Sequence, residues 1–143
     1  MSANANHTAS RKASVALWTI QVLLAALFLF AGIFKLLAPA AALTAQGPFT
    51  AGFLRFIGVC ETLGALGLVL PGLLRIGREL TPLAAAGLVI IMLGATATTV
   101  AIGGAAGALV PAVVGILAAS VVYGRRALLP RRTGRIRVLQ PAS

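Results

Sequence analysis

Long uncharged apolar runs dominate the chain. No residue is charged from Ala13 to Phe34, and none is charged from Leu80 to Gly124. A helix that crosses a bilayer needs about 20 mostly apolar residues, so the first run can hold one such helix and the second can hold two. A further apolar segment lies between them. The sequence therefore predicts an all-α membrane protein, a bundle of four transmembrane helices at about residues 15–37, 53–74, 80–100 and 108–124.

Polar residues, prolines and glycines separate these helices. Residues 1–12 are small and polar, and we expect them to form an N-terminal tail. Residues 38–52 contain two prolines and two glycines and are expected to form a loop. The Pro71–Gly72 pair predicts the closing turn of the second helix, and Thr81–Pro82 predicts the start of the third, with Thr as cap and Pro in the first turn.

One transmembrane domain, residues 13–125, is expected, followed by a basic tail over residues 126–143. A cleaved signal peptide is the alternative interpretation of the first apolar run. Apolar cores of signal peptides span only about 7–15 residues, and this run is longer. We therefore prefer a first helix that stays in the membrane.

Basic residues mark one side of the predicted bundle. They cluster in residues 11–12, 75–78 and 125–137, whereas the loops 38–52 and 101–108 contain no Lys or Arg. Cytoplasmic loops of membrane proteins carry an excess of Lys and Arg. This distribution predicts a multi-pass protein of the inner (plasma) membrane with both termini in the cytoplasm.

Composition supports the same interpretation. Hydrophobic residues make up 59% of the 143 residues and charged residues only 10%, whereas soluble domains carry about 25% charged residues. The net charge of +10 does not indicate a nucleic-acid partner, because each basic cluster adjoins an apolar run. The lipid bilayer is the expected partner, with anionic lipid headgroups at the arginine-rich C-terminal tail. The sequence leaves a homo-oligomer open.

Few residues offer metal or thiol chemistry. Cys60 is the only cysteine, so the chain has no disulfide or C-x-x-C pair, and a buried lone cysteine usually packs as a small apolar residue. The only histidine, His7, lies in the N-terminal tail, and the chain contains no Asp. No metal site is expected from these residues.

Several polar residues fall within the predicted helices. Gln21, Phe28 and Lys35 are spaced by heptads and share one helix face, which should point at other helices. Glu61 lies about 8 residues, or roughly 12 Å, into the second helix, where a charge usually marks a functional path or an internal ion pair. We expect a polar cluster of Glu61 and Lys35, with Gln21 and Arg55 as further members. It is either a structural ion pair or a catalytic or binding site, and the sequence leaves both open.

Small and hydroxyl residues are expected to serve packing. Small residues let transmembrane helices approach closely, which predicts helix contacts at the residues Gly58, Gly64, Ala65, Gly67, Ala84, Gly87 and Gly94. Threonines in helices commonly return a hydrogen bond to their own backbone. We expect this of the residues Thr96, Thr98 and Thr99.

The chain resembles the DoxX and DoxX-like family of small bacterial membrane proteins. The resemblance is carried by the segments Phe30–Leu36 (FAGIFKL), Phe53–Pro71 (FLRFIGVCETLGALGLVLP), Thr81–Gly87 (TPLAAAG) and Met92–Ala95 (MLGA), of which the second is the most specific. It implies a four-helix membrane bundle in which Lys35, Arg55 and Glu61 are the characteristic polar positions. Members often have a His where this chain has Thr98–Thr99, which argues against a mechanism that needs imidazole.

The resemblance also gives an expected function. The family name comes from association with thiosulfate:quinone oxidoreductase, which implies a membrane subunit or scaffold of a quinone-linked redox system, with quinone as a possible cofactor and a soluble or membrane redox protein as partner. One alternative is a membrane enzyme that acts on a lipophilic small molecule, with Glu61 as general acid or base. The other is a small proton-coupled transporter. Whether the chain is an enzyme stays open.

Overall fold

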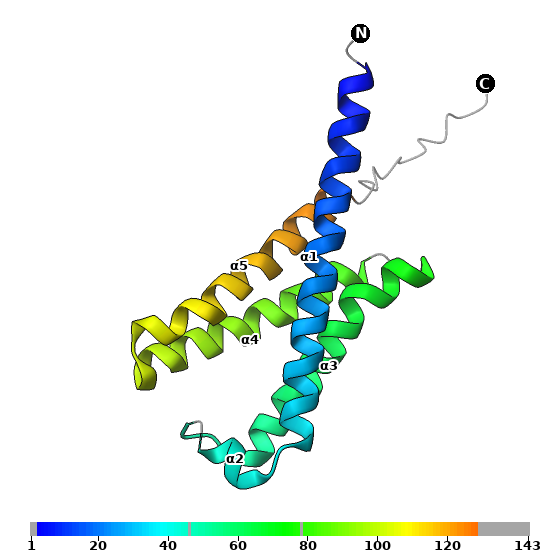
Figure 1. Cartoon of the computed structure of the whole chain (residues 1–143). Coiled ribbons are helices and arrows are strands. Elements are labelled where there is room, and N and C mark those ends of the chain that lie inside the picture. Colours follow the sequence, from blue (N-terminus) through cyan, green and yellow to red (C-terminus); the bar gives the residue numbers. More distant parts are fainter. Residues whose placement is uncertain (1–2, 46, 78, 129–143) are drawn as a thin grey trace, which may run out of the picture.

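The computed structural model describes residues 3–45, 47–77 and 79–128, and the described chain is helical throughout apart from short connections (Figure 1). The elements are α1 (Ala3–Leu37), α2 (Ala40–Thr44), α3 (Ala51–Leu74), α4 (Leu80–Gly103) and α5 (Ala105–Leu128). The predicted basic tail over residues 126–143 lies outside the described residues from position 129 onward.

Four of these helices are long and apolar enough to cross a membrane. The spans are Lys12–Leu37, Ala51–Leu74, Leu80–Gly103 and Ala105–Arg126. Large apolar side chains cover their outer faces, as at Phe30, which is 74% exposed. Such a surface needs a lipid environment. The predicted four-helix membrane bundle is confirmed.

Several helix boundaries differ from those expected. Helix α1 begins at Ala3, so the segment that we expected to be a tail continues the first helix. The expected loop 38–52 contains the short helix α2. Between α4 and α5 the connection is a single residue, Gly104, whose φ of 80° is readily adopted by glycine. This sharp turn lets both helices extend further than their hydropathy alone indicated.

The facing ends of α3 and α4 lie at the predicted residues, Leu74 and Leu80, but the predicted cap at Thr81 is not used. Pro71 is buried inside α3, which continues to Leu74 and ends on Arg75 in the left-handed conformation (φ 56°). Helix α4 starts before the predicted Thr81–Pro82 signal, with Glu79 at its N-cap and no side-chain capping bond. At the start of α3, the Thr50 hydroxyl accepts a hydrogen bond from the Phe53 N–H and caps the helix.

The helices form two pairs. Helix α1 packs along α3, α4 packs along α5, and α3 and α4 join the pairs (Figure 1). We call the end with Lys12, Arg75 and Arg126 the basic end, and the end with α2 and Gly104 the neutral end. Towards the neutral end the α4–α5 pair diverges from the α1–α3 pair (Figure 1).

An apolar core fills the bundle where the pairs meet. It comprises Leu24, Phe28, Ala65, Leu68, Ala85, Leu88, Met92, Ala118 and Val121. On α1 the buried residues Gln21, Leu24, Phe28 and Gly32 follow the three-and-four spacing of one helix face. The prediction that this face points at other helices is therefore confirmed.

Only some of the expected glycine contacts occur. A Cβ at Gly64 would lie 2.7 Å from Leu88, and a Cβ at Gly67 would lie 2.7 Å from Ala84, so α3 packs closely on α4. For Gly87 and Gly94, however, nothing among the described atoms lies within 4 Å of such a Cβ. The prediction of close packing at these two positions is wrong. Both glycines are exposed on the surface of α4.

Candidate functional site

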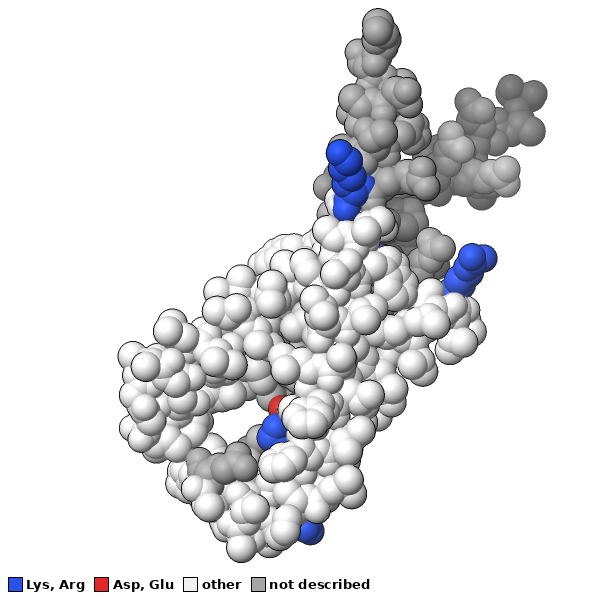
Figure 2. Space-filling model, in the orientation of Figure 1, with Lys and Arg blue, Asp and Glu red and all other residues white. Residues whose placement is uncertain are grey.

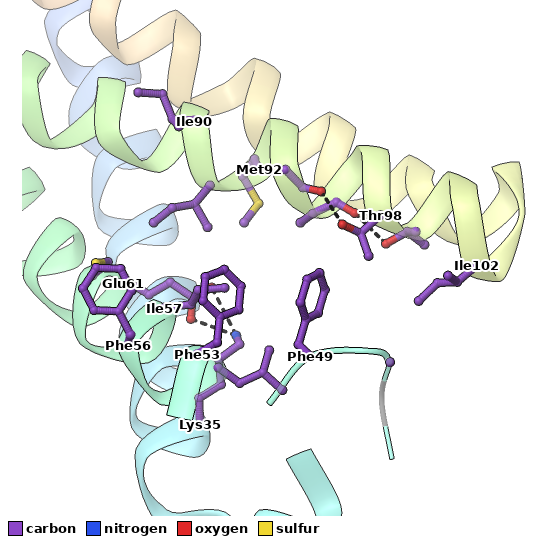
Figure 3. Close-up of a pocket in the computed structure, with 17 residues that line it drawn as sticks. Lys35, Phe49, Phe53, Phe56, Ile57, Glu61, Ile90, Met92, Thr98 and Ile102 are labelled. Atoms are coloured by element: carbon purple, nitrogen blue, oxygen red, sulfur yellow. Dashed lines mark hydrogen bonds and ion pairs between the residues drawn. The ribbon is translucent and has the colours of Figure 1, made fainter. Parts of the chain in front are cut away.

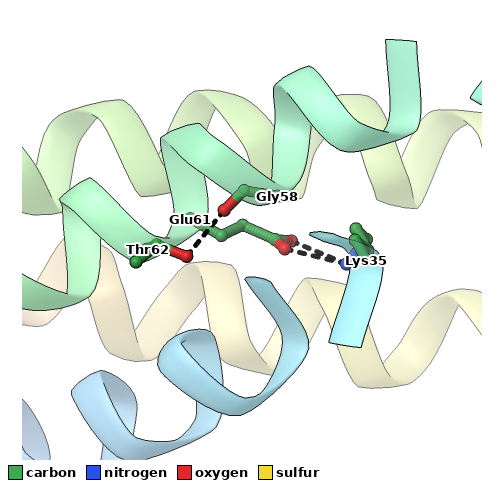
Figure 4. A network of polar contacts seen from close by, with 4 residues as sticks. All are labelled: Lys35, Gly58, Glu61 and Thr62. Atoms are coloured by element: carbon green, nitrogen blue, oxygen red, sulfur yellow. Dashed lines mark hydrogen bonds and ion pairs between the residues drawn. The ribbon is translucent and has the colours of Figure 1, made fainter. Parts of the chain in front are cut away.

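Lys35 and Glu61 form an ion pair between α1 and α3 (Figure 4). The Lys35 Nζ donates to both carboxylate oxygens of Glu61, at 2.8 and 3.1 Å. The carboxylate is almost fully enclosed, with a side chain 4% exposed, while the Lys35 side chain is 23% exposed. An ammonium group has three N–H donors, so Lys35 can hold Glu61 and still present a donor to a further group.

A close crossing of α1 and α3 positions this ion pair. Gly32 precedes Lys35 by three residues, and Gly58 precedes Glu61 by three, so each glycine lies one turn away on the same helix face. A Cβ at Gly32 would lie 2.7 Å from the Gly58 carbonyl oxygen. Beside the crossing, the Thr62 hydroxyl donates to that same oxygen at 2.8 Å (Figure 4). The glycines bring the two backbones close enough for the side chains to meet.

The ion pair borders a cavity in the neutral half of the bundle (Figure 3). Its volume is about 640 Å³, within the range of roughly 300–1,000 Å³ that is typical of small-molecule sites. Figure 2 shows a hollow on one face of the molecule, with basic and acidic atoms at its edge. The cavity exists because α4 diverges from α1 and α3 at this level.

The cavity wall is mostly apolar and aromatic. Phe49 and Phe53 stand side by side with ring centroids 5.3 Å apart, and Phe56 lies on the same helix as Phe53 (Figure 3). Ile90 and Ile102 line the opposite wall on α4 (Figure 3). Flat aromatic rings and branched aliphatic side chains suit a planar or aliphatic ligand.

A few polar atoms interrupt this wall. Thr98 and Thr99 line it, and their hydroxyls donate to the carbonyls of Gly94 and Ala95 at 2.9 and 2.8 Å. Thr96 likewise donates to its own helix backbone, so the prediction for the three threonines is confirmed. With its proton committed to the backbone, each hydroxyl oxygen on the wall can still accept a hydrogen bond.

The structure brings together only two of the expected cluster members. Arg55 is exposed on α3, does not line the cavity, and has no side-chain hydrogen bond or ion pair with another described residue. Gln21 is buried, but it lies 14 residues from Lys35 along α1, which is about 21 Å. The expected four-membered cluster is therefore an ion pair of Lys35 and Glu61.

Gln21 belongs to a second polar cluster near the basic end. Its side-chain N–H donates to the carbonyl of Leu68 at 2.7 Å, and its oxygen accepts from the Nε of Arg125 at 2.6 Å. The Arg125 guanidinium also lies 5.3 Å from the ring centroid of Trp18, and that ring packs against Gly72. The cluster joins α1, α3 and α5.

Sequence reasoning missed Arg125 as a member of this cluster. The residue was assigned only to the row of topology-determining arginines. The sequence did contain a signal for this contact. Gln21 is closer along α1 to Lys12 at the basic end than to Lys35, and α5, which carries Arg125, ends at that same end of the bundle. Antiparallel helices place residues from opposite ends of the chain at one level.

Comparison with known sequences agrees with this architecture. The sequence profile of the DoxX-like family matches residues 19–121. The chain belongs to the DoxX-like family. The family resemblance inferred from the helix motifs is confirmed, and the DoxX-like chain is an integral membrane protein. The match includes Lys35, Glu61 and Arg55 and ends before Arg125. No curated protein and no solved structure matches the chain significantly.

Proposed function

We propose that this DoxX-like chain is a membrane subunit of a quinone-linked redox system and that its cavity binds the head of a quinone or a similar lipophilic acceptor. The observation that carries the proposal is a cation on an apolar wall that has one N–H donor beyond the two that bond to Glu61. Lys35 is held by Glu61 at 2.8 Å, borders the cavity and keeps donor capacity. A quinone carbonyl is an acceptor of the kind this donor requires, and a charge-assisted hydrogen bond is among the stronger ones.

The remaining wall fits the same ligand. A quinone ring is flat and packs favourably on aromatic faces such as those of Phe49 and Phe53. Thr98 and Thr99 offer acceptor oxygens to a hydroxyl of the reduced ring. The site can therefore hold both oxidation states of such a ring, with Lys35 serving the carbonyl form.

A subunit role accounts for the cavity better than a self-contained enzyme does. Among the described residues that line the cavity, the only titratable ones are Lys35, Glu61 and Cys60. Both oxygens of Glu61 already accept hydrogen bonds from Lys35. The carboxylate is therefore engaged in the ion pair and is poorly placed to act as a general acid or base. Electrons for a quinone would then come from a soluble or membrane redox partner that docks on the chain.

The core also favours binding over transport. Leu24, Phe28, Leu68 and Leu88 are buried between the cavity and the basic end. A transported solute or proton would need a polar path through this layer. This buried apolar layer at the centre of the bundle is more compatible with a ligand that enters and leaves the cavity on one side than with a solute that crosses the whole bundle.

The proposed orientation follows from the basic end. Arg75, Arg125 and Arg126 lie there, and the positive-inside rule places that end in the cytoplasm. The protein is then a multi-pass protein of the inner membrane with the cavity in its outer half. Arginines of the C-terminal segment would lie at the anionic headgroups of the inner leaflet.

Equilibrium binding tests the proposal. The full-length chain in lipid nanodiscs is titrated with dimethoxy-methyl-benzoquinone, a ubiquinone head without a tail. The double variant Lys35→Met/Glu61→Gln removes the donor without leaving a buried charge, and we expect it to weaken binding about tenfold or more, as for the loss of one charge-assisted hydrogen bond.

Arg55→Met provides the matched control, since Arg55 is a cation on α3 outside the cavity. Its affinity should stay within about twofold of the wild type, because it removes no contact with the ligand. If the double variant binds the quinone head as well as the wild type does, or if the wild type does not bind it, the proposal is wrong.

A further inference from the structure

A second hollow runs along the surface between α3 and α4. Its volume is about 690 Å³. We call it the α3–α4 groove. Its lining comes from one face of α3 between Cys60 and Pro71 and one face of α4 between Leu80 and Ile91. Apart from one thiol, these side chains are apolar, so the groove offers a ligand van der Waals contact and almost no hydrogen bonding.

The α3–α4 groove adjoins the cavity at Lys35 and Glu61. Three residues line both hollows, namely Cys60 on α3 and Ile90 and Ile91 on α4. In Figure 3 the labelled Ile90 lies at the edge of the cavity, on the stretch of α4 that leads away from Thr98 and Ile102. A single elongated molecule could therefore lie in both hollows without crossing a helix.

The groove has a definite direction along the helices. From Cys60 to Pro71 it follows α3 for 11 residues, which is about 16 Å towards the basic end. At Gly64 and Gly67 it adjoins the close packing of α4 on α3. At Gly87 the space is open, since nothing described lies within 4 Å of a Cβ placed there. This part of the groove has room for a chain of methylene or isoprenoid groups.

We propose that the α3–α4 groove holds the apolar tail of the ligand whose head binds at Lys35 and Glu61. The inference rests on the proposed function and narrows its ligand to a tailed amphiphile. The polar end of the combined site lies in the neutral half of the bundle. The groove continues from Cys60, near the middle of α3, to Pro71 and Leu80 beside the basic end. A tail in the groove would therefore cross the bilayer centre into the leaflet opposite its head. The lining includes exposed side chains such as Leu83, which is 66% exposed, so the tail could enter sideways from lipid.

Tail contacts in a membrane select a ligand more than they strengthen its binding. Lipid chains are as apolar as the groove, so moving a tail from lipid into protein gains packing but little hydrophobic free energy. The position of the tail is therefore a sharper readout than the overall affinity. A photoreactive group at the end of the tail reports that position directly.

The test uses a ubiquinone analogue whose decyl tail ends in a diazirine. The full-length chain in phosphatidylcholine nanodiscs is irradiated with this probe, and labelled peptides are mapped by mass spectrometry. We expect labelling within residues 63–71 and 80–88, and competition by excess tail-less dimethoxy-methyl-benzoquinone. Gly87→Trp fills the groove and should reduce this labelling about fivefold, while the affinity for the tail-less head stays within about twofold.

Leu93→Trp is the matched control, because Leu93 is an exposed position of α4 that lines neither hollow. It should leave labelling unchanged. Labelling of the apolar α1 face at Phe30 and Phe34, or labelling that Gly87→Trp does not reduce, overturns the tail assignment alone. A wild-type chain that binds no tail-less head overturns the proposed function as well.

Discussion

Lys35 and Glu61 are unequally placed, and this decides what each contributes. The Glu61 side chain is 4% exposed and its charge is satisfied by Lys35, whereas Lys35 is 23% exposed at the cavity. Breaking a buried ion pair by removing one partner is costly because an uncompensated charge stays behind. A charge left on Glu61 has less access to polar surroundings than one left on Lys35. The lysine is therefore the more important partner for stability.

This asymmetry predicts the order of three variants. Lys35→Met should lower the free energy of unfolding by about 3 kcal/mol, and Glu61→Gln by about 1 kcal/mol, since the remaining ammonium can reach the cavity. The double variant Lys35→Met/Glu61→Gln should be more stable than Lys35→Met alone. Unfolding in SDS of the purified protein measures all three. Strictly additive effects would contradict the ion pair.

Glycines decide how closely α1 and α3 approach. A Cβ at Gly58 would lie 2.9 Å from the Gly32 carbonyl oxygen and 2.9 Å from the Lys35 Cβ. Neither atom can move aside without shifting a helix, because one belongs to the backbone and the other is fixed to it. Gly87, a glycine of α4 on the open surface, meets nothing of the kind. The same residue type thus has opposite structural roles on the two helices.

Alanine substitutions should separate these roles. Gly58→Ala forces α1 and α3 apart and should destabilise the bundle by about 1–3 kcal/mol, the usual range for overpacking. Gly87→Ala should be neutral or stabilising by up to about 1 kcal/mol, because alanine favours a helix over glycine. The midpoint of unfolding in SDS distinguishes the two. Equal effects at both positions would mean that the α1–α3 crossing is not as close as described.

The whole molecule has two unlike ends. The basic end carries Arg75, Arg125 and Arg126 together with the Gln21 cluster. The neutral end carries α2, the Gly104 turn and the opening between the helix pairs, and it has few charges among the described residues. Since Lys and Arg are usually retained on the cytoplasmic side, this asymmetry predicts that the basic end faces the cytoplasm.

Cysteine labelling tests the insertion. In a Cys60→Ser background, Ala45→Cys places a thiol at the neutral end and Glu79→Cys places one at the basic end. Both positions are exposed. A membrane-impermeant maleimide applied to intact cells should label Ala45→Cys, and should label Glu79→Cys only after the cells are permeabilised. The reverse pattern would mean that the cavity faces the cytoplasmic half.

The sequence by itself determined the number of spans and the identity of the ion pair. Four spans follow from hydropathy, because each helix must satisfy its own backbone in lipid and cover it with apolar side chains. Lys35 and Glu61 could be paired in advance because adjacent antiparallel helices bring their positions to the same level. The sequence pattern also predicted the buried face of α1 correctly.

Only the tertiary structure decided which polar groups share a neighbourhood. Gln21 and Lys35 lie on one face of α1, yet one meets Arg125 of α5 and the other meets Glu61 of α3. The divergence of the helix pairs likewise opens the cavity. In lipid the contacts between helices depend on packing geometry. Hydropathy along the chain shows which face is buried, whereas the helix crossings decide what that face meets.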